Sequence, residues 1–90
     1  MTTPPKVSFL IPAQNRPLEL KAALASCIAQ SLEAWEAVVV DDHSDSADLA
    51  ALITTLNDSR LSYCRLKPGE GGVAEARNRA VAMAKSERLI

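Results

Sequence analysis

A run of apolar residues that ends in two carboxylates constrains this chain more than any other feature. Residues 36–40 read Glu-Ala-Val-Val-Val and are followed at once by Asp41 and Asp42. A nearly continuous run of β-branched residues predicts a parallel strand that is buried on both faces. Two adjacent carboxylates cannot both stay in an apolar layer, because an unpaired buried charge costs several kcal/mol. We therefore expect the chain to leave the sheet here, at the edge where open α/β sheets bind ligands.

The rest of the chain alternates strand and helix patterns around this run. The predicted elements are a strand over 6–12, a helix over 17–31, the strand over 36–40, a helix from 44–46 to 56, a strand over 60–66, a helix over 73–84 and the start of a strand over 86–90. Pro12, which has no N–H, is expected to end the first strand. The order βαβαβαβ predicts an α/β fold of three layers with a mainly parallel sheet of about four strands.

Each predicted helix carries an apolar stripe that is expected to face the sheet. The stripes are Leu20, Leu24, Cys27 and Ile28 in the first helix, Leu49, Leu52, Ile53 and Leu56 in the second, and Val73, Ala76, Ala80, Val81 and Ala84 in the third. Apolar residues make up 48% of the chain but aromatic residues only 3%, so the predicted core is aliphatic. Cys27 and Cys64 lack metal-ligand spacing and are interpreted as buried thiols.

Length and charge limit the classes of function. Ninety residues form one small domain at most, near the lower limit for an adequate core, so we expect part of a larger domain or a homo-oligomer. The net charge is -1 and no lysine and arginine cluster is present, which argues against nucleic acid as a partner. Residues 1–5 are expected to be a disordered lead without a signal-peptide pattern. No run approaches the roughly 20 apolar residues of a membrane span, so a cytoplasmic location is expected.

Polar side chains follow the first two strands and form the candidate site. If these strands are neighbours, the loop over 12–16 and the turn over 41–46 open at one edge of the sheet. Gln14 and Asn15 offer amides there, and Asp42 offers a carboxylate that accepts an N–H of a nucleotide base. In the alternative interpretation these residues cap helices, with Asn15 at the first helix and Asp41, Ser44 and Asp45 at the second.

Further along, Arg77 lies beside the apolar stripe of the third helix, about one turn beyond Gly71 and Gly72. A guanidinium in that place favours an anion, either phosphate or the acidic turn. Alternatively, its stem lies on apolar surface with its head in water. The glycine turn over 69–72 is neither a dinucleotide fingerprint nor a phosphate loop. His43 is interpreted as a solvated turn residue.

Three segments together resemble the opening signatures of the family 2 glycosyltransferases. They are residues 7–17, residues 38–44 and residues 71–78, in the family's order and over nearly all of the chain. The resemblance implies a nucleotide-diphospho-sugar transferase fold, of which residues 1–90 are one partial domain, the Rossmann-like nucleotide-binding half. It implies transfer of a sugar from a nucleotide-diphospho-sugar donor, most simply of the uridine type, to an acceptor. The nucleotide-binding residues that it implies are Pro12, Gln14, Asn15, Asp41, Asp42, Arg77 and Asn78.

The chain departs from the family pattern in two places. Gln14 stands where the family often has a tyrosine that stacks on the base. Leu89 and Ile90 stand where the fourth strand would run into an Asp-x-Asp motif for Mn²⁺ or Mg²⁺, so no metal ligand and no catalytic residue is predicted, and the chain is expected to be inactive by itself.

Two other hypotheses remain. One is a non-catalytic nucleotide-binding or interaction fragment. The other is a signalling receiver domain, which the acidic pair resembles but which needs a phosphoacceptor Asp where this chain has Leu66, Lys67 and Pro68.

Overall fold

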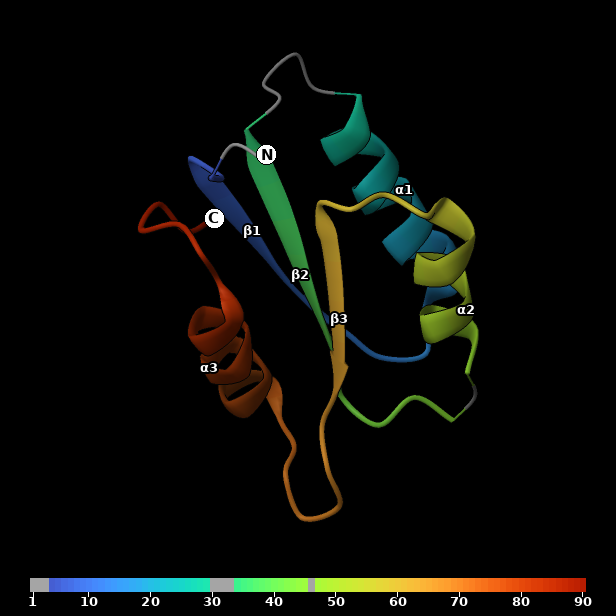
Figure 1. Cartoon of the computed structure of the whole chain (residues 1–90). Coiled ribbons are helices and arrows are strands. Elements are labelled where there is room, and N and C mark those ends of the chain that lie inside the picture. Colours follow the sequence, from blue (N-terminus) through green and yellow to red (C-terminus); the bar gives the residue numbers. More distant parts are fainter. Residues whose placement is uncertain (1–3, 30–33, 46) are drawn as a thin grey trace.

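Strands and helices alternate along the chain, as the sequence pattern predicts. The computed structural model describes residues 4–29, 34–45 and 47–90. Its elements are β1 (Val7–Ala13), α1 (Pro17–Ile28), β2 (Trp35–Asp41), α2 (Asp48–Leu56), β3 (Leu61–Arg65) and α3 (Val73–Met83). Figure 1 traces this order from the blue β1 to the orange-red α3. The predicted α/β class is therefore confirmed.

The valine-rich strand β2 forms the centre of a parallel sheet. The strand order is β1-β2-β3, with Ile11 opposite Val39 and Val39 opposite Tyr63. Every residue of β2 is buried, because strands flank it on both sides and helices cover both faces. This burial is what a nearly continuous apolar run predicts for a central parallel strand.

The predicted number of about four strands is too high for the described residues, which contain three strands. Residues 86–90 form an isolated parallel bridge, Ser8 to Leu89, on the free edge of β1. Around this bridge Leu10 donates its N–H to the carbonyl of Ile90 at 2.8 Å, and Ile90 donates to Ser8 at 2.9 Å. The residues that were predicted to begin a fourth strand thus pair with β1, but over too short a length to form a strand.

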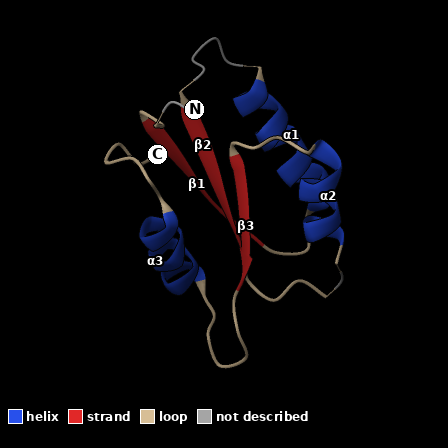
Figure 2. Cartoon of the chain, in the orientation of Figure 1, coloured by secondary structure: helices blue, strands red, loops and turns tan. Residues whose placement is uncertain are grey.

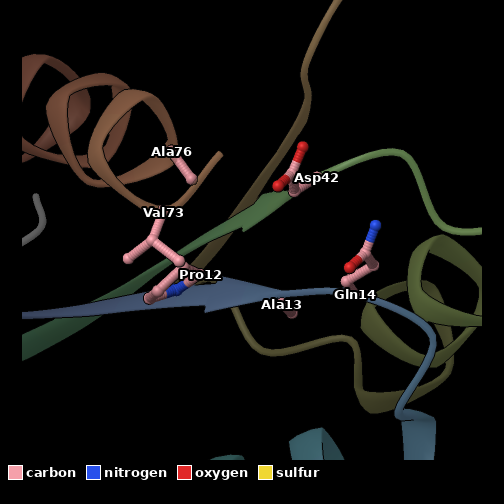
Figure 3. A pocket seen from close by; sticks show the side chains of 6 residues that line it. All are labelled: Pro12, Ala13, Gln14, Asp42, Val73 and Ala76. Atoms are coloured by element: carbon pink, nitrogen blue, oxygen red, sulfur yellow. The ribbon is translucent and has the colours of Figure 1, made fainter. Parts of the chain in front are cut away.

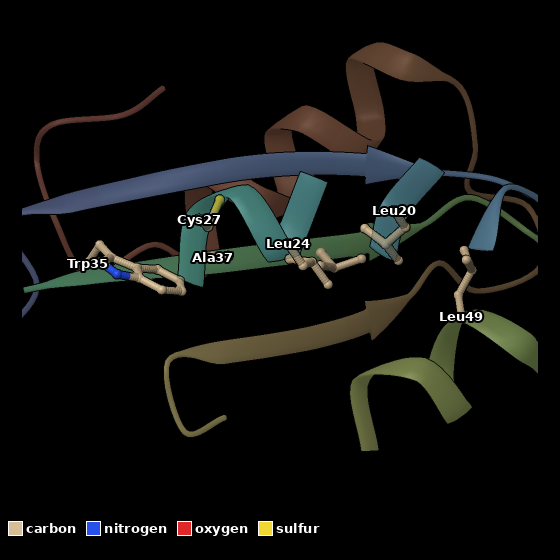
Figure 4. Close-up of a cluster of buried hydrophobic side chains, with 7 residues drawn as sticks. Leu20, Leu24, Cys27, Trp35, Ala37 and Leu49 are labelled. Carbon is tan, nitrogen blue, oxygen red and sulfur yellow. The ribbon is translucent and has the colours of Figure 1, made fainter. Parts of the chain in front are cut away.

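The helices lie on both faces of the sheet and give the predicted three layers. Helices α1 and α2 cover one face, and α3 covers the other (Figure 2). The core on the α1 and α2 face contains Leu20, Leu24, Cys27, Trp35, Ala37, Val39 and Leu49 (Figure 4). The core on the α3 face contains Leu10, Val38, Val40, Leu66, Ala76 and Ala80. Alternate residues of β2 therefore supply both cores, as the period of a strand requires.

Pro12 does not end β1, which continues to Ala13, opposite Asp41. Ser8 and Leu10 direct their N–H groups outward, to the carbonyls of Arg88 and Ile90. Because strand residues alternate in direction, Pro12 faces the same outer edge. Its missing N–H therefore removes no hydrogen bond to β2, which is the position in which a strand tolerates proline.

Some predicted core positions and bounds differ from the structure. Val73 is 76% exposed, Val81 42% and Ile28 37%. The residues of α3 that pack on the sheet are Ala76, Ala80 and Met83, and Ile28 is the last residue of α1. Cys64 is only partly buried, whereas Cys27 is buried as predicted. The first helix was predicted to extend to residue 31, but residues 30 and 31 lie outside the described residues. Residues 1–3 of the predicted disordered lead also lie outside them.

A buried carboxylate within β2 joins the end of the described chain to the sheet. Glu36 accepts hydrogen bonds from the Ser8 hydroxyl and from the backbone N–H of Lys85, both at 2.5 Å. Ser86 donates its N–H to the same hydroxyl at 3.2 Å. These contacts hold the segment after α3 against β1, where the bridge to Leu89 follows. No described helix has the length and apolar character needed to cross a membrane.

Candidate functional site

A pocket of about 160 Å³ lies at the carboxyl ends of the strands, where the candidate residues were expected to meet. It is lined by Pro12, Ala13, Gln14, Asp42, Val73 and Ala76. Figure 3 shows that these side chains come from the end of β1 and the loop after it, from the residue after β2 and from the first turns of α3. Three of the predicted site residues, Pro12, Gln14 and Asp42, therefore line one pocket. A neighbouring hollow of about 410 Å³ shares Gln14 and extends to Arg16 and Glu19.

Asp41 is not among the residues that line this pocket, because its carboxylate is fully buried at the end of β2. Its Oδ1 accepts from the backbone N–H of Ser44 at 2.9 Å and from the Ser44 hydroxyl at 2.7 Å. Its Oδ2 accepts from the Tyr63 hydroxyl at 2.6 Å and lies 3.6 Å from Arg65 Nη1. These groups act against the desolvation that makes a buried carboxylate costly. The chain consequently leaves the sheet one residue later than predicted.

The protonation of this pair follows from its contacts. Burial raises the pKa of Asp41, but the hydrogen bonds from Tyr63 and Ser44 and the charge of Arg65 outweigh it, so the pKa of Asp41 is lowered. Burial, the hydrogen bond to Asp41 and its negative charge raise the pKa of Tyr63 to about 12, against a smaller opposing effect of Arg65. At neutral pH Asp41 is therefore an anion and Tyr63 a neutral donor.

Asp42 is half-buried and presents its carboxylate to the pocket. Its backbone N–H donates to the carbonyl of Ala13 at 2.9 Å, which fixes it beside the end of β1. Its Oδ2 accepts the N–H of Gly72 at 3.0 Å. Among the described residues, no group donates a hydrogen bond to its Oδ1. This second oxygen is the acceptor that a ligand can use.

Asn15 joins the loop after β1 to the acidic turn. Its backbone is left-handed, with φ 52°, and its N–H donates to the Ser44 hydroxyl at 2.9 Å. Its side-chain Oδ1 accepts the N–H of Asp45 at 2.6 Å, and its Nδ2 donates to the Asp45 carboxylate at 3.3 Å. The two loops are thus fixed to each other by Asn15, which contacts the turn rather than the pocket.

The capping alternative is wrong for the described residues. Helix α1 has Arg16 at its N-cap and α2 has Ala47, and neither residue makes a side-chain capping hydrogen bond. Asp41 Oδ1, Asn15 Oδ1 and Asp45 Oδ2 instead accept hydrogen bonds within the acidic turn and its link to β1. Ser46, the third predicted cap, lies outside the described residues.

Arg77 and Asn78 lie exposed on α3 and do not line the pocket. No hydrogen bond or ion pair joins Arg77 to another residue in the described part of the chain. This agrees with the alternative in which its head lies in water. Contact of Arg77 and Asn78 with a nucleotide stays a prediction.

Several residues of this region were not predicted as part of it. Arg65 and Tyr63 stand opposite Asp41 and Val39 in the register of β2 and β3, so a known register would have placed them near Asp41. His43 is half-buried and hydrogen-bonded rather than simply solvated: its backbone has φ 59° and its Nε2 lies 2.5 Å from the carbonyl of Glu70. Because a carbonyl only accepts, Nε2 carries the proton. His43 therefore holds the glycine turn.

The described residues do not fit the Mn²⁺ or Mg²⁺ that the resemblance implies. Divalent ions of this kind need several oxygen ligands around one point. No three histidine, cysteine, aspartate or glutamate side chains gather in that way within residues 4–29, 34–45 and 47–90. Both oxygens of Asp41 are already hydrogen-bonded. No chemical step of this chain is assigned to a metal.

Comparison with known proteins decides the family. The sequence model described as Glycosyl transferase family 2 matches residues 8–90. The chain belongs to glycosyl transferase family 2. Membership confirms the resemblance and excludes the receiver-domain hypothesis.

Two relatives of this family 2 glycosyl transferase chain cover different lengths of it. The chain is 34% identical over 90 residues to the "Putative colanic acid biosynthesis glycosyl transferase WcaA" of Escherichia coli (strain K12), across 99% of the chain and 32% of that protein. It is 36% identical over 58 residues to "Protein CgeD" of Bacillus subtilis (strain 168), across 64% of the chain and 14% of that protein. The chain thus spans a third or less of the length of these relatives.

Proposed function

We propose that this chain binds the nucleotide of a uridine-type nucleotide-diphospho-sugar donor, as part of a glycosyl transferase that passes the sugar to an acceptor. The observation that carries this proposal is the carboxylate of Asp42 in the pocket between β1, β2 and α3, with Oδ1 open to a ligand. A carboxylate is an acceptor only, and the imide of uracil carries one N–H between two carbonyl groups. A hydrogen bond between them is charge-assisted.

The other lining residues complement a base. Gln14 brings an amide with two N–H donors, which suit the carbonyl oxygens of uracil. Pro12, Val73 and Ala76 contribute apolar surface for the face of the ring. Gln14 cannot stack as an aromatic residue does, so we expect modest affinity.

The size of the pocket restricts what it holds. Its volume of about 160 Å³ lies below the roughly 300–1,000 Å³ of pockets that enclose a whole drug-sized ligand. It suits a base better than a complete donor. The diphosphate and the sugar would then lie outside it, toward surfaces that other residues must supply.

A second candidate is a nucleotide-binding module without transferase activity. The lack of a metal-ligand cluster among the described residues favours it. Both candidates use the same pocket and differ only in turnover, so the experiment below tests what they share.

Replacing Asp42 by Asn should weaken binding of uridine diphosphate about 10- to 100-fold, the equivalent of roughly 1.5–3 kcal/mol for a hydrogen bond to a charged group. An asparagine that keeps its oxygen on the Gly72 N–H turns its Nδ2 donor toward the base N–H, so two donors would face each other. Isothermal titration calorimetry measures the change, and thermal melts of each variant separate binding from stability.

Asp45→Asn is the matched control, because it also removes one negative charge. Asp45 lies three residues after Asp42, and its exposed carboxylate does not line the pocket. This variant should leave the dissociation constant within about twofold, since surface changes of this kind are small. Equal affinity of wild type and Asp42→Asn would show that the acidic turn does not read the base.

A further inference from the structure

The glycine turn between β3 and α3 is held in place by side chains that the proposed function does not use. The carboxylate of Glu70 accepts the N–H of Lys67 at 2.7 Å and Nη2 of Arg79 at 2.6 Å. The carbonyl of Glu70 accepts from His43 at 2.5 Å. The turn is therefore fixed both to α3, through Arg79, and to the acidic turn, through His43.

This turn contacts Asp42 through two glycines in two different ways. The N–H of Gly72 donates to Asp42 Oδ2 at 3.0 Å. At Gly71, an added Cβ would lie 3.3 Å from Asp42 Oδ1, which is closer than most real contacts of a Cβ, and 3.7 Å from the His43 ring, which is an ordinary contact. One glycine thus occupies one carboxylate oxygen, and the other leaves the second oxygen uncovered.

We propose that Gly71 and Gly72 are positioning residues that make Asp42 a one-oxygen acceptor and thereby select the base, an inference that rests on the proposed function. Gly72 holds Oδ2, so the carboxylate offers Oδ1 alone. Gly71 lacks a side chain, so a ligand can reach that oxygen. A fixed carboxylate also loses less side-chain freedom when the ligand binds.

A one-oxygen acceptor discriminates between bases by the number of adjacent donors. Uracil presents one imide N–H and needs one oxygen. Guanine presents a ring N–H next to an amino group, and this pair matches both oxygens of a free carboxylate. With Oδ2 held by Gly72, a guanine would leave one donor unpaired, and an unpaired polar group in a closed site is costly. The selected class is therefore the nucleotide with a single imide donor.

Gly71→Ala tests the open oxygen, with Gly69→Ala as its matched control. The backbone of Gly71 lies outside the left-handed region, so alanine adds contact with Asp42 without backbone strain. Gly69 has the opposite properties: its φ is 91°, and an added Cβ meets no atom within 4 Å. Calorimetry with uridine diphosphate should give about tenfold weaker binding for Gly71→Ala, the equivalent of 1.4 kcal/mol. Gly69→Ala should lower the melting temperature and keep the wild-type affinity.

Two further measurements complete the test. Wild type should bind guanosine diphosphate at least about tenfold more weakly than uridine diphosphate. In NMR spectra the Gly72 amide proton should lie downfield in free wild type and move upfield in Asp42→Asn, with the Gly69 amide unchanged. This second readout needs no nucleotide and reports the Gly72 contact itself.

The outcomes separate this inference from the proposed function. Three results would each overturn the inference but leave the proposed function standing. The first is a Gly71→Ala variant that binds uridine diphosphate as tightly as wild type does. The others are equal wild-type affinity for the two nucleotides, and a Gly72 amide proton whose chemical shift does not change in Asp42→Asn. A wild type that binds neither nucleotide overturns the proposed function and the inference with it.

Discussion

Two neighbouring carboxylates of identical chemistry have different roles in this chain. Asp41 is fully buried, and Ser44, Tyr63 and Arg65 surround it, so it holds β2 to β3 and to the turn. Asp42, one residue later, has one oxygen held by Gly72 and one free. Environment, not residue type, therefore decides which of the two carboxylates lines the pocket.

Tyr63→Phe should cost about 1.5–3 kcal/mol of unfolding free energy at neutral pH, because it removes a hydrogen bond to a buried charged group. It should also change the alkaline limit of stability. The pKa of Tyr63 rises from 10.0 to about 12 on folding, so above pH 10 the folded state keeps a proton that the unfolded state loses. Wild-type stability should then fall between about pH 10 and 12.

Urea unfolding at a series of pH values measures this difference, and Tyr63→Phe should lack the tyrosine part of the alkaline fall. Tyr63 is the only tyrosine of the chain, so its ionisation can be followed by ultraviolet absorbance without overlap from another tyrosine. On the acid side the sign is reversed: the lowered pKa of Asp41 means that its stabilisation is lost as the pH falls below about 3.8. A tyrosine that titrates at its ordinary pKa in the folded chain would contradict the buried contact.

At the scale of the elements, α3 carries one wall of the pocket and lies close to the sheet because its contact residues are small. Ala76 and Ala80 are fully buried against Leu10, Val38 and Val40. Val73, in the first turn of the same helix, lines the pocket yet is largely exposed. The distance between α3 and the sheet therefore controls the shape of the pocket.

Ala80→Leu should destabilise the chain by about 1–3 kcal/mol, because a well-packed interface has no room for the added carbons. For a domain of this size each kcal/mol lowers the melting temperature by roughly 4–8 °C. Ala82→Leu, on an exposed position of the same helix, is the control and should stay within about 0.5 kcal/mol of wild type. Calorimetric melts compare the two. Equal melting temperatures would mean that α3 does not pack through Ala80.

The sequence predicts elements of this chain better than it predicts contacts between them. The apolar run over 36–40 and the Pro17 start of α1 are local signals, so both elements appear where they were predicted. The link from Tyr63 to Asp41 depends on the register of two strands 22 residues apart, which no local pattern encodes. Pro12, Gln14 and Asp42 meet because parallel strands end at one edge, whereas the exposure of Arg77 depends on the rotation of α3.

At the scale of the whole molecule, the sheet has unequal edges. On one side β3 is an edge strand with no further strand in the described residues, and on the other β1 is covered only by the short bridge to Leu89. Open edges favour pairing with another chain. Exposed apolar side chains, among them Leu18 and Val81, add to this tendency.

We therefore keep the prediction that the chain associates, with a second copy as the partner. Sedimentation velocity at high micromolar concentration should give a dimer that dissociates on dilution. Replacing Cys64, the fourth of the five residues of β3, by Lys should weaken the dimer, because lysine on an edge strand opposes pairing. A folded monomer at all concentrations would contradict the prediction.

The contact of Glu36 with Ser8 and Lys85 has a consequence for how the chain is made. Ser8 and Lys85 both donate hydrogen bonds to the carboxylate of Glu36. These two donors are 77 residues apart in sequence. A ribosome adds roughly 5–20 residues per second, so several seconds pass between the emergence of Ser8 and that of Lys85. During that interval the outer edge of β1 has no partner and Glu36 lacks its second donor. The outer edge of β1 can pair with this segment only when the segment has left the exit tunnel.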